Sequence, residues 1–177
     1  MSKYKPTNKI ELRSLIENNN IYLGDIDTSL ITDMSMLFDK PNFACFEGSY
    51  SEYESYNVRI DFSGIEKWDT SNVINMRSMF HNIKNFNIDI NNWNVSNVTD
   101  MAYMFFGAEN FNHPLNKWNV SNVKSMTCMF KNAYNFNQDL NDWKINKDAD
   151  IKDMFVNTSL IEKPHWYNLS NYFNSFY

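Results

Sequence analysis

The 177-residue sequence has few of the residues on which most catalytic and metal sites depend. It contains only four glycines, four prolines, two cysteines and three histidines. Cys45 and Cys128 are far apart and lack CxxC spacing, which argues against a disulfide framework and against a zinc site. His81, His113 and His165 show no metal-ligand spacing, and no glycine-rich phosphate loop or GxSxG motif occurs. We therefore expect no metal, no cofactor and no enzymatic activity.

Clustered positive charge and long apolar runs are absent as well. The net charge is −5, and no group of lysines and arginines forms the basic patch that binds nucleic acid or an anionic membrane. No apolar stretch is long enough to span a membrane, and the N-terminal MSKYKPTNKIELRSLIENNN has no signal-peptide pattern. We expect neither a nucleic-acid partner nor membrane insertion, and the missing signal keeps a cytoplasmic location open.

The sequence does contain an internal repeat, with a period of about 25 residues. Four tryptophans recur at one constant spacing: Trp68, Trp93, Trp118 and Trp143. A phenylalanine follows each of them at a constant interval: Phe80, Phe105, Phe130 and Phe155. A degenerate first copy begins at Ile26, because DTSLITDMSMLF at 27–38 aligns with DTSNVINMRSMF at 69–80. The interval from Ile26 to Trp68 is longer than one period, so the first copy contains an insertion.

Each copy predicts a short strand followed by a short helix. The tryptophan and the residue two positions later have the spacing of a strand with one buried face. Position +7, counted from the tryptophan, holds a helix-capping residue in every copy: Asp33, Asn75, Asp100, Ser125 and Asp150. Apolar residues follow at +8, +11 and +12, which is helical spacing. Position +14 holds residues that tolerate the left-handed conformation at the end of a helix: Asn82, Gly107, Asn132 and Asn157.

Repeats of this length bury their apolar faces only by stacking on their neighbours. The prediction is an α/β fold, a right-handed leucine-rich-repeat-like solenoid with one short parallel strand and one short helix per repeat. The tryptophans and phenylalanines of the repeat form its core columns. The chain is one domain with an N-terminal helical cap at 1–25, repeats at 26–155 with an insertion at 40–60, and an aromatic C-terminal cap at 156–177.

The repeat units resemble those of a known family. WNVSNVTDMAYMFFGAENFN and WNVSNVKSMTCMFKNAYNFNQDLNDW are similar to the repeats of BspA-like leucine-rich-repeat surface proteins, a bacterial group related to mycoplasma-type lipoprotein repeats. The resemblance extends from about Lys5 to Phe155. It implies a non-enzymatic protein, displayed on the cell surface or secreted, that adheres to matrix proteins or other cells. The sequence departs from the pattern in having no export signal or lipobox cysteine near its start, and in the long segment 40–60.

Two groups of residues are candidates for binding a partner. If the tryptophans face inward, the residues that follow them face outward: Asp69, Asn94 and Asn119. The insertion supplies aromatic side chains on an irregular loop, where binding residues often lie: Phe43, Phe46, Tyr50, Tyr53 and Tyr56. The same rings could instead pack on the flank of the solenoid. An adhesion module that binds a protein or glycan partner is the first hypothesis, and a cytoplasmic structural or scaffold protein is the alternative.

Overall fold

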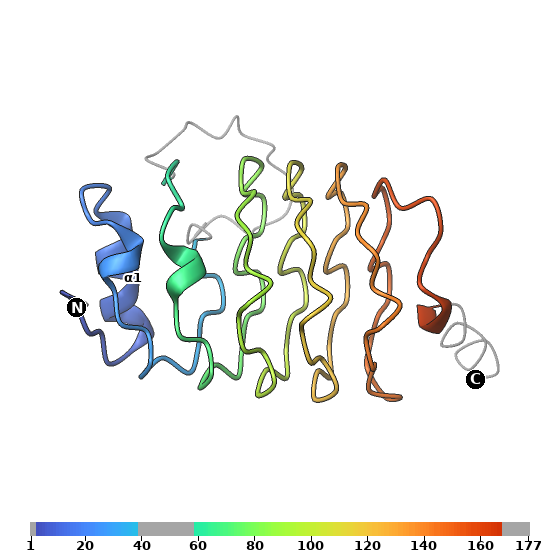
Figure 1. Ribbon diagram of the computed structural model, residues 1–177, viewed down its shortest axis with the longest axis horizontal. Coiled ribbons are helices and arrows are strands. Elements are labelled where there is room, and N and C mark those ends of the chain that lie inside the picture. Colours follow the sequence, from blue (N-terminus) through green and yellow to red (C-terminus); the bar gives the residue numbers. More distant parts are fainter. Residues whose placement is uncertain (1–2, 39–58, 168–177) are drawn as a thin grey trace, which may run out of the picture.

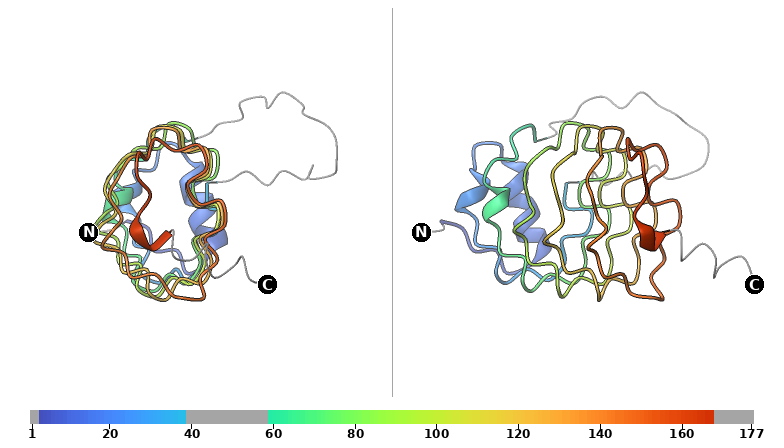
Figure 2. Two further views of the ribbon diagram at one scale, coloured as in Figure 1. Left: turned by 90° about the vertical axis from the view of Figure 1, so that its right-hand side faces the viewer. Right: turned by 45° about the vertical axis from the view of Figure 1, so that its right-hand side comes forward.

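The chain winds through successive coils that are stacked along the long axis of the molecule (Figure 1). The computed structural model describes residues 3–38 and 59–167. Seen along the axis, the coils nearly superimpose, and α1 (Lys9–Glu17) lies at the N-terminal end of the stack, as Figures 1 and 2 show. Two short 3-10 helices, η1 (Leu23–Asp25) and η2 (Ile65–Lys67), pack against each other. None of the helices in the described ranges is long and apolar enough to cross a membrane.

The predicted strand and helix of each repeat are not formed. Apart from a helical turn at 165–167, the helices within residues 3–38 and 59–167 are α1, η1 and η2, and the coils are joined by isolated parallel bridges rather than by strands. Four of these bridges connect the residues at position +7 of neighbouring coils, from Asp33 through to Asp150. The α/β class and the leucine-rich-repeat-like solenoid are therefore wrong, because the coils consist of turns.

A left-handed residue at position +10 explains why the predicted helix does not form. The residue at this position has a φ between 53° and 59° in every copy: Met36, Ser78, Tyr103, Cys128 and Asp153. An α-helix requires a negative φ throughout, so a helix that began after position +7 would be interrupted within its first turn. Position +14 is left-handed too, as predicted, with φ between 58° and 66°. Left-handed residues four positions apart produce consecutive tight turns instead of a helix.

Backbone hydrogen bonds between the coils follow this alternating conformation. Every second amide donates to a carbonyl of the next coil at 2.7–2.9 Å: Met76 to Asp100, Ser78 to Ala102, Phe80 to Met104 and Asn82 to Phe106. The amides in between, such as that of Met79, donate to a carbonyl of their own turn. The next two pairs of coils repeat the pattern. We call positions +8 to +14 of the stacked coils the turn ladder. It satisfies the polar main chain without any strand.

Aromatic columns fill the interior of the stack. The four repeat tryptophans are 3–4% exposed, and the repeat phenylalanines are 0–3% exposed. Neighbouring rings from Phe80 to Phe155 lie nearly parallel, with centroids 5.4–5.8 Å apart. Each indole N–H donates to a carbonyl of the preceding coil, as Trp118 does to Ile90 at 3.1 Å. The polar edge of the ring is therefore satisfied inside an apolar core.

The helix α1 closes the N-terminal end of the stack. Asn8 accepts the amide of Glu11, and the Glu11 carboxylate accepts the amide of Thr7 at 2.7 Å, so the helix begins with a reciprocal capping arrangement. Leu12 and Ile16 are buried against the first coils. The buried guanidinium of Arg59 donates to the carbonyls of Ile16 and of two residues beyond the helix, Asn18 and Ile21. Arg59 thereby stabilises the exposed carbonyl end of α1.

At the other end, Trp166 continues the tryptophan column. Its ring stacks on Trp143 with a centroid distance of 6.3 Å, and its Nε1 donates to the carbonyl of Leu140 at 2.8 Å. Tyr167 packs against Phe155 in an edge-to-face contact with centroids 5.1 Å apart. The last coil is thus covered over its aromatic interior.

Truncation of a central tryptophan tests the stacked columns. We expect Trp118→Ala to lower the free energy of unfolding by about 3–5 kcal/mol, because it removes a buried ring and leaves a cavity. It also removes the donor to the Ile90 carbonyl. Denaturant melts followed by circular dichroism measure the change. Trp118→Phe keeps a ring in the column and should cost less, while a loss under about 1 kcal/mol for the alanine variant would contradict the stacked-column arrangement.

Gly107 offers a test of the left-handed positions. Its φ is +66°, and a methyl group on its α-carbon would overlap Oδ1 of Asn82 in the preceding coil. We expect Gly107→Ala to lower the free energy of unfolding by about 1–2 kcal/mol for the backbone alone, with a further loss from the overlap. Asn82→Gly removes the overlapping atom, so thermal melts of the double variant should show a recovery relative to the sum of the single variants. If the losses of the two single variants instead add up to the loss of the double variant, the overlap with Asn82 does not set the free-energy cost of Gly107→Ala.

Candidate interaction surface

The three outward residues predicted to bind a partner are exposed and also shape the backbone. Asp69, Asn94 and Asn119 each accept the amide of the serine two residues later, at 2.9–3.2 Å. This is an Asx turn, in which a short side chain replaces a backbone acceptor. The residue type at this position therefore has a structural explanation. The aromatic residues of the predicted binding loop, Phe43, Phe46, Tyr50, Tyr53 and Tyr56, lie outside the described residues.

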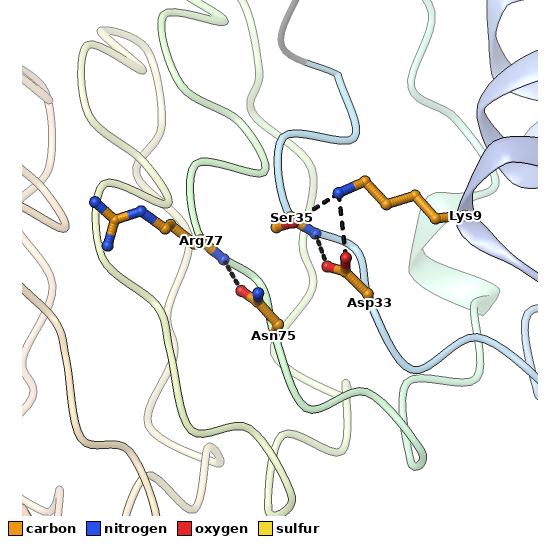
Figure 3. A network of polar contacts seen from close by, with 5 residues as sticks. All are labelled: Lys9, Asp33, Ser35, Asn75 and Arg77. Carbon is orange, nitrogen blue, oxygen red and sulfur yellow. Dashed lines mark hydrogen bonds and ion pairs between the residues drawn. The ribbon is translucent and has the colours of Figure 1, made fainter.

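Polar contacts join α1 to the first coil of the turn ladder, and an equivalent side-chain contact holds the turn of the second coil (Figure 3). Asp33 and Asn75 occupy position +7 of neighbouring coils, and each accepts the backbone amide two residues later, at 2.8 and 3.0 Å. Lys9 of α1 donates to Ser35 Oγ at 2.7 Å and to Asp33 Oδ2 at 3.2 Å. Burial acts to raise the pKa of Asp33, but hydrogen bonds from Ser35 and Lys9 outweigh it and lower the pKa. The capping residues predicted at +7 thus hold turns rather than helices.

Beyond these contacts, four partly exposed side chains from two adjacent coils form a patch on the turn ladder. Arg77 and His81 come from one coil, and Tyr103 and Phe106 come from the next. The Arg77 guanidinium carbon lies 5.1 Å from the centre of the Tyr103 ring. The His81 ring stacks on Phe106 with centroids 5.1 Å apart, and Tyr103 lies 6.0 Å from Phe106. We call these four residues the Arg77–Phe106 patch.

The backbone of the ladder places these side chains on the outside. Residues at +8, +11 and +12 are buried in the core, as Met76, Met79 and Phe80 show. The four side chains of the patch occupy positions +9, +10 and +13 and are partly exposed, whereas the small residues Ala102, Ser78 and Cys128 at +9 and +10 are buried. In Figure 3 the Arg77 side chain extends away from Asn75 toward the following coil, where its Nη1 lies 3.6 Å from the Asp100 carboxylate. Ring contacts and this ion pair thus join side chains of the two adjacent coils.

The sequence interpretation missed this patch, although a signal for it exists. It sought outward residues on a predicted strand, and the described part of the chain has no strand there. Tyr103 and Phe106 depart from the two neighbouring copies, which have Ser78 and Cys128 at +10 and His81 and Lys131 at +13. The repeat consensus alone does not explain a large aromatic residue at a position where neighbouring copies have smaller or more polar residues.

The described part of the chain has no cluster of three or more His, Cys, Asp or Glu residues able to hold a metal ion. Cys128 is buried next to Tyr103, and burial raises the pKa of its thiol, against a smaller opposing effect of Lys131. A thiol with a raised pKa is a poor nucleophile at neutral pH.

The first copy allows a pH test of the Asx turns. Asp27 stands at the same position as Asp69, accepts the Ser29 amide at 3.0 Å and pairs with Lys5 at 2.9 Å. Hydrogen bonds from Ser29, and then from Lys5, lower the pKa of Asp27 to about 2. Because the folded pKa lies below the unfolded value of about 3.9, this stabilisation is complete above about pH 5 and is lost as the pH falls toward 2.

We expect Asp27→Asn to reduce the acid dependence of stability. Between pH 5 and 2 the free energy of unfolding of the variant should fall by about 1 kcal/mol less than that of the wild type, after allowing for solvent screening of this partly exposed group. Chemical denaturation at a series of pH values measures it. Lys5→Ala should reproduce part of the effect, and identical pH profiles for wild type and Asp27→Asn would refute the assignment.

Comparison with known proteins gives one family. The family described as "Mycoplasma protein of unknown function, DUF285" matches residues 49–166, which is more than half of the chain and includes the whole Arg77–Phe106 patch. No curated protein and no solved structure matches the chain.

Proposed function

We propose that this chain, which belongs to the family described as "Mycoplasma protein of unknown function, DUF285", is a non-enzymatic binding protein. It contacts a polypeptide partner through the Arg77–Phe106 patch. The observation that carries the proposal is the set of four partly exposed Arg, His, Tyr and Phe side chains that contact one another across two coils. Arginine and aromatic residues are enriched where protein interfaces derive most of their binding energy.

Rigidity of the patch supports this proposal. Tyr103 is itself a left-handed ladder residue, and its amide donates to the following coil at 2.9 Å. The amide of Asn82, next to His81, donates to the following coil at 2.7 Å. A surface whose backbone and rings are already ordered loses little conformational entropy when it binds. The resemblance of the repeats to those of BspA-like surface proteins supports adhesion as the biological setting, with a protein of another cell or of a matrix as the partner.

Substitutions taken from other copies of the repeat provide a test that leaves the fold intact. Tyr103→Ser introduces the residue of Ser78, and Phe106→Lys introduces that of Lys131, at equivalent positions. The wild type and the double variant are immobilised and exposed to native-cell and matrix extracts, and the captured proteins are quantified by mass spectrometry. We expect the double variant to lose its partner at least about tenfold, since one interface anchor contributes about 2 kcal/mol or more.

Two matched controls separate this surface from the others. Asn94→Lys with Asn119→Lys alters the exposed Asx-turn row and uses the residue of Lys144 at the same position. Substitution of serine for Phe43, Phe46, Tyr50, Tyr53 and Tyr56 removes the aromatic rings of the predicted binding loop and keeps Arg59 in place. Both controls should retain the partner, and circular dichroism should show the same fold for all variants. Retention by the Tyr103→Ser/Phe106→Lys variant, with loss in either control, would place the binding site elsewhere and overturn the proposal.

A further inference from the structure

In the last coil, a row of backbone amides has no hydrogen-bond acceptor among the described residues. Positions +8, +10, +12 and +14 donate to the following coil throughout the stack, and in the coil of Trp118 they do so at 2.7–3.0 Å. In the coil of Trp143 the same positions are Ile151, Asp153, Phe155 and Asn157. Across residues 3–38 and 59–167, no group accepts a hydrogen bond from any of these four amides. We call them the amide edge.

The conformation of the amide edge is that of the paired coils. Asp153 and Asn157 have φ values of 56° and 60°, which match Cys128 and Asn132 one coil earlier. The amides of Met154 and Val156 donate within their own turns, as their equivalents do elsewhere. On the other side of the same coil, the carbonyls of Asp150, Lys152, Met154 and Val156 accept the amides of the preceding coil. The last coil is therefore arranged for one more neighbour.

The aromatic interior of this end is already closed. Trp166 occupies the next place in the tryptophan column, and Tyr167 covers Phe155. Phe155 is 3% exposed and Met154 is fully buried. A neighbour at the amide edge would therefore gain main-chain hydrogen bonds and little apolar contact, which favours small side chains on its inward-facing residues.

The opposite end of the ladder does not offer a matching surface. There α1 packs over the first coil, with Leu12 and Ile16 buried and Lys9 bonded to Ser35 and Asp33. Head-to-tail pairing of two copies would have to displace this helix. The occupant that the geometry fits is instead a short peptide segment that presents carbonyls at every second residue.

We propose that the amide edge binds a polypeptide segment of another chain by main-chain hydrogen bonding, in the register that the coils use among themselves. The segment adopts the turn conformation of positions +7 to +14, with left-handed residues four apart and small residues facing the stack. Peptides add to the exposed edge of a β-sheet through main-chain hydrogen bonds, and binding at the amide edge is the equivalent for a ladder of turns. The site is independent of the Arg77–Phe106 patch.

The experiment uses the full chain and a synthetic peptide. The probe has the sequence of residues 123–135, with glycine in place of Cys128 at the left-handed position and alanine in place of Met126, Met129 and Phe130. The matched control has proline in place of Cys128, because the proline ring fixes φ at a negative value and cannot adopt the left-handed turn. Hydrogen exchange, resolved by residue with nuclear magnetic resonance, reports on the edge amides before and after addition of peptide at about 1 mM, near the affinity range of weak complexes.

We expect the four edge amides to exchange at least about tenfold faster than the amides of Met126, Cys128, Phe130 and Asn132 in the free protein, since the latter are hydrogen-bonded to the next coil. The glycine peptide should slow the edge amides selectively, and the proline peptide should not. Slow exchange of the edge amides in the free protein, no slowing by the glycine peptide, or equal slowing by both peptides would each overturn the proposal.

Discussion

The rest of the structure depends on the left-handed backbone at position +10. Met36, Ser78, Tyr103, Cys128 and Asp153 all adopt it, although an L-residue in this region costs roughly 1–2 kcal/mol relative to a right-handed one. Because the turn it creates directs every second amide toward the next coil, the cost is offset by hydrogen bonds that run through the whole stack. Aromatic columns then fill the interior that these turns enclose. Without the left-handed residue the segment would be free to form a helix, and the ladder between the coils would be lost.

The equal spacing of Trp68, Trp93, Trp118 and Trp143 was enough to predict which residues occupy equivalent places in neighbouring coils. The left-handed conformation at +14 was also predictable, because asparagine and glycine have a known preference for it. Position +10 gave no such signal. Its tyrosine, cysteine and methionine are residues that rarely adopt a positive φ, so the apolar spacing at +8, +11 and +12 favoured a helix. The wrongly predicted helix follows from that single position.

The candidate surface was harder to predict than the core for a related reason. Core positions recur in every copy, and their recurrence identifies them. The Arg77–Phe106 patch combines side chains from two coils that are a full repeat apart in sequence, and its aromatic residues are unusual at their positions. Only the ladder geometry shows that Arg77 reaches Tyr103 and that His81 reaches Phe106. Arg59 is a similar case, since no pattern in the sequence connects it to the end of α1.

The direction of the turn ladder gives one face of the protein an electrical polarity. Its inter-coil bonds run from the amide of one coil to the carbonyl of the next, so every second peptide dipole along this face points the same way along the stack. The carbonyl end then carries a partial negative charge and the amide end a partial positive one. Lys9 lies at the first of these ends, while Asp150 and Asp153 belong to the coil at the second. Charged residues thus complement the two ends of a dipole that grows with each added repeat.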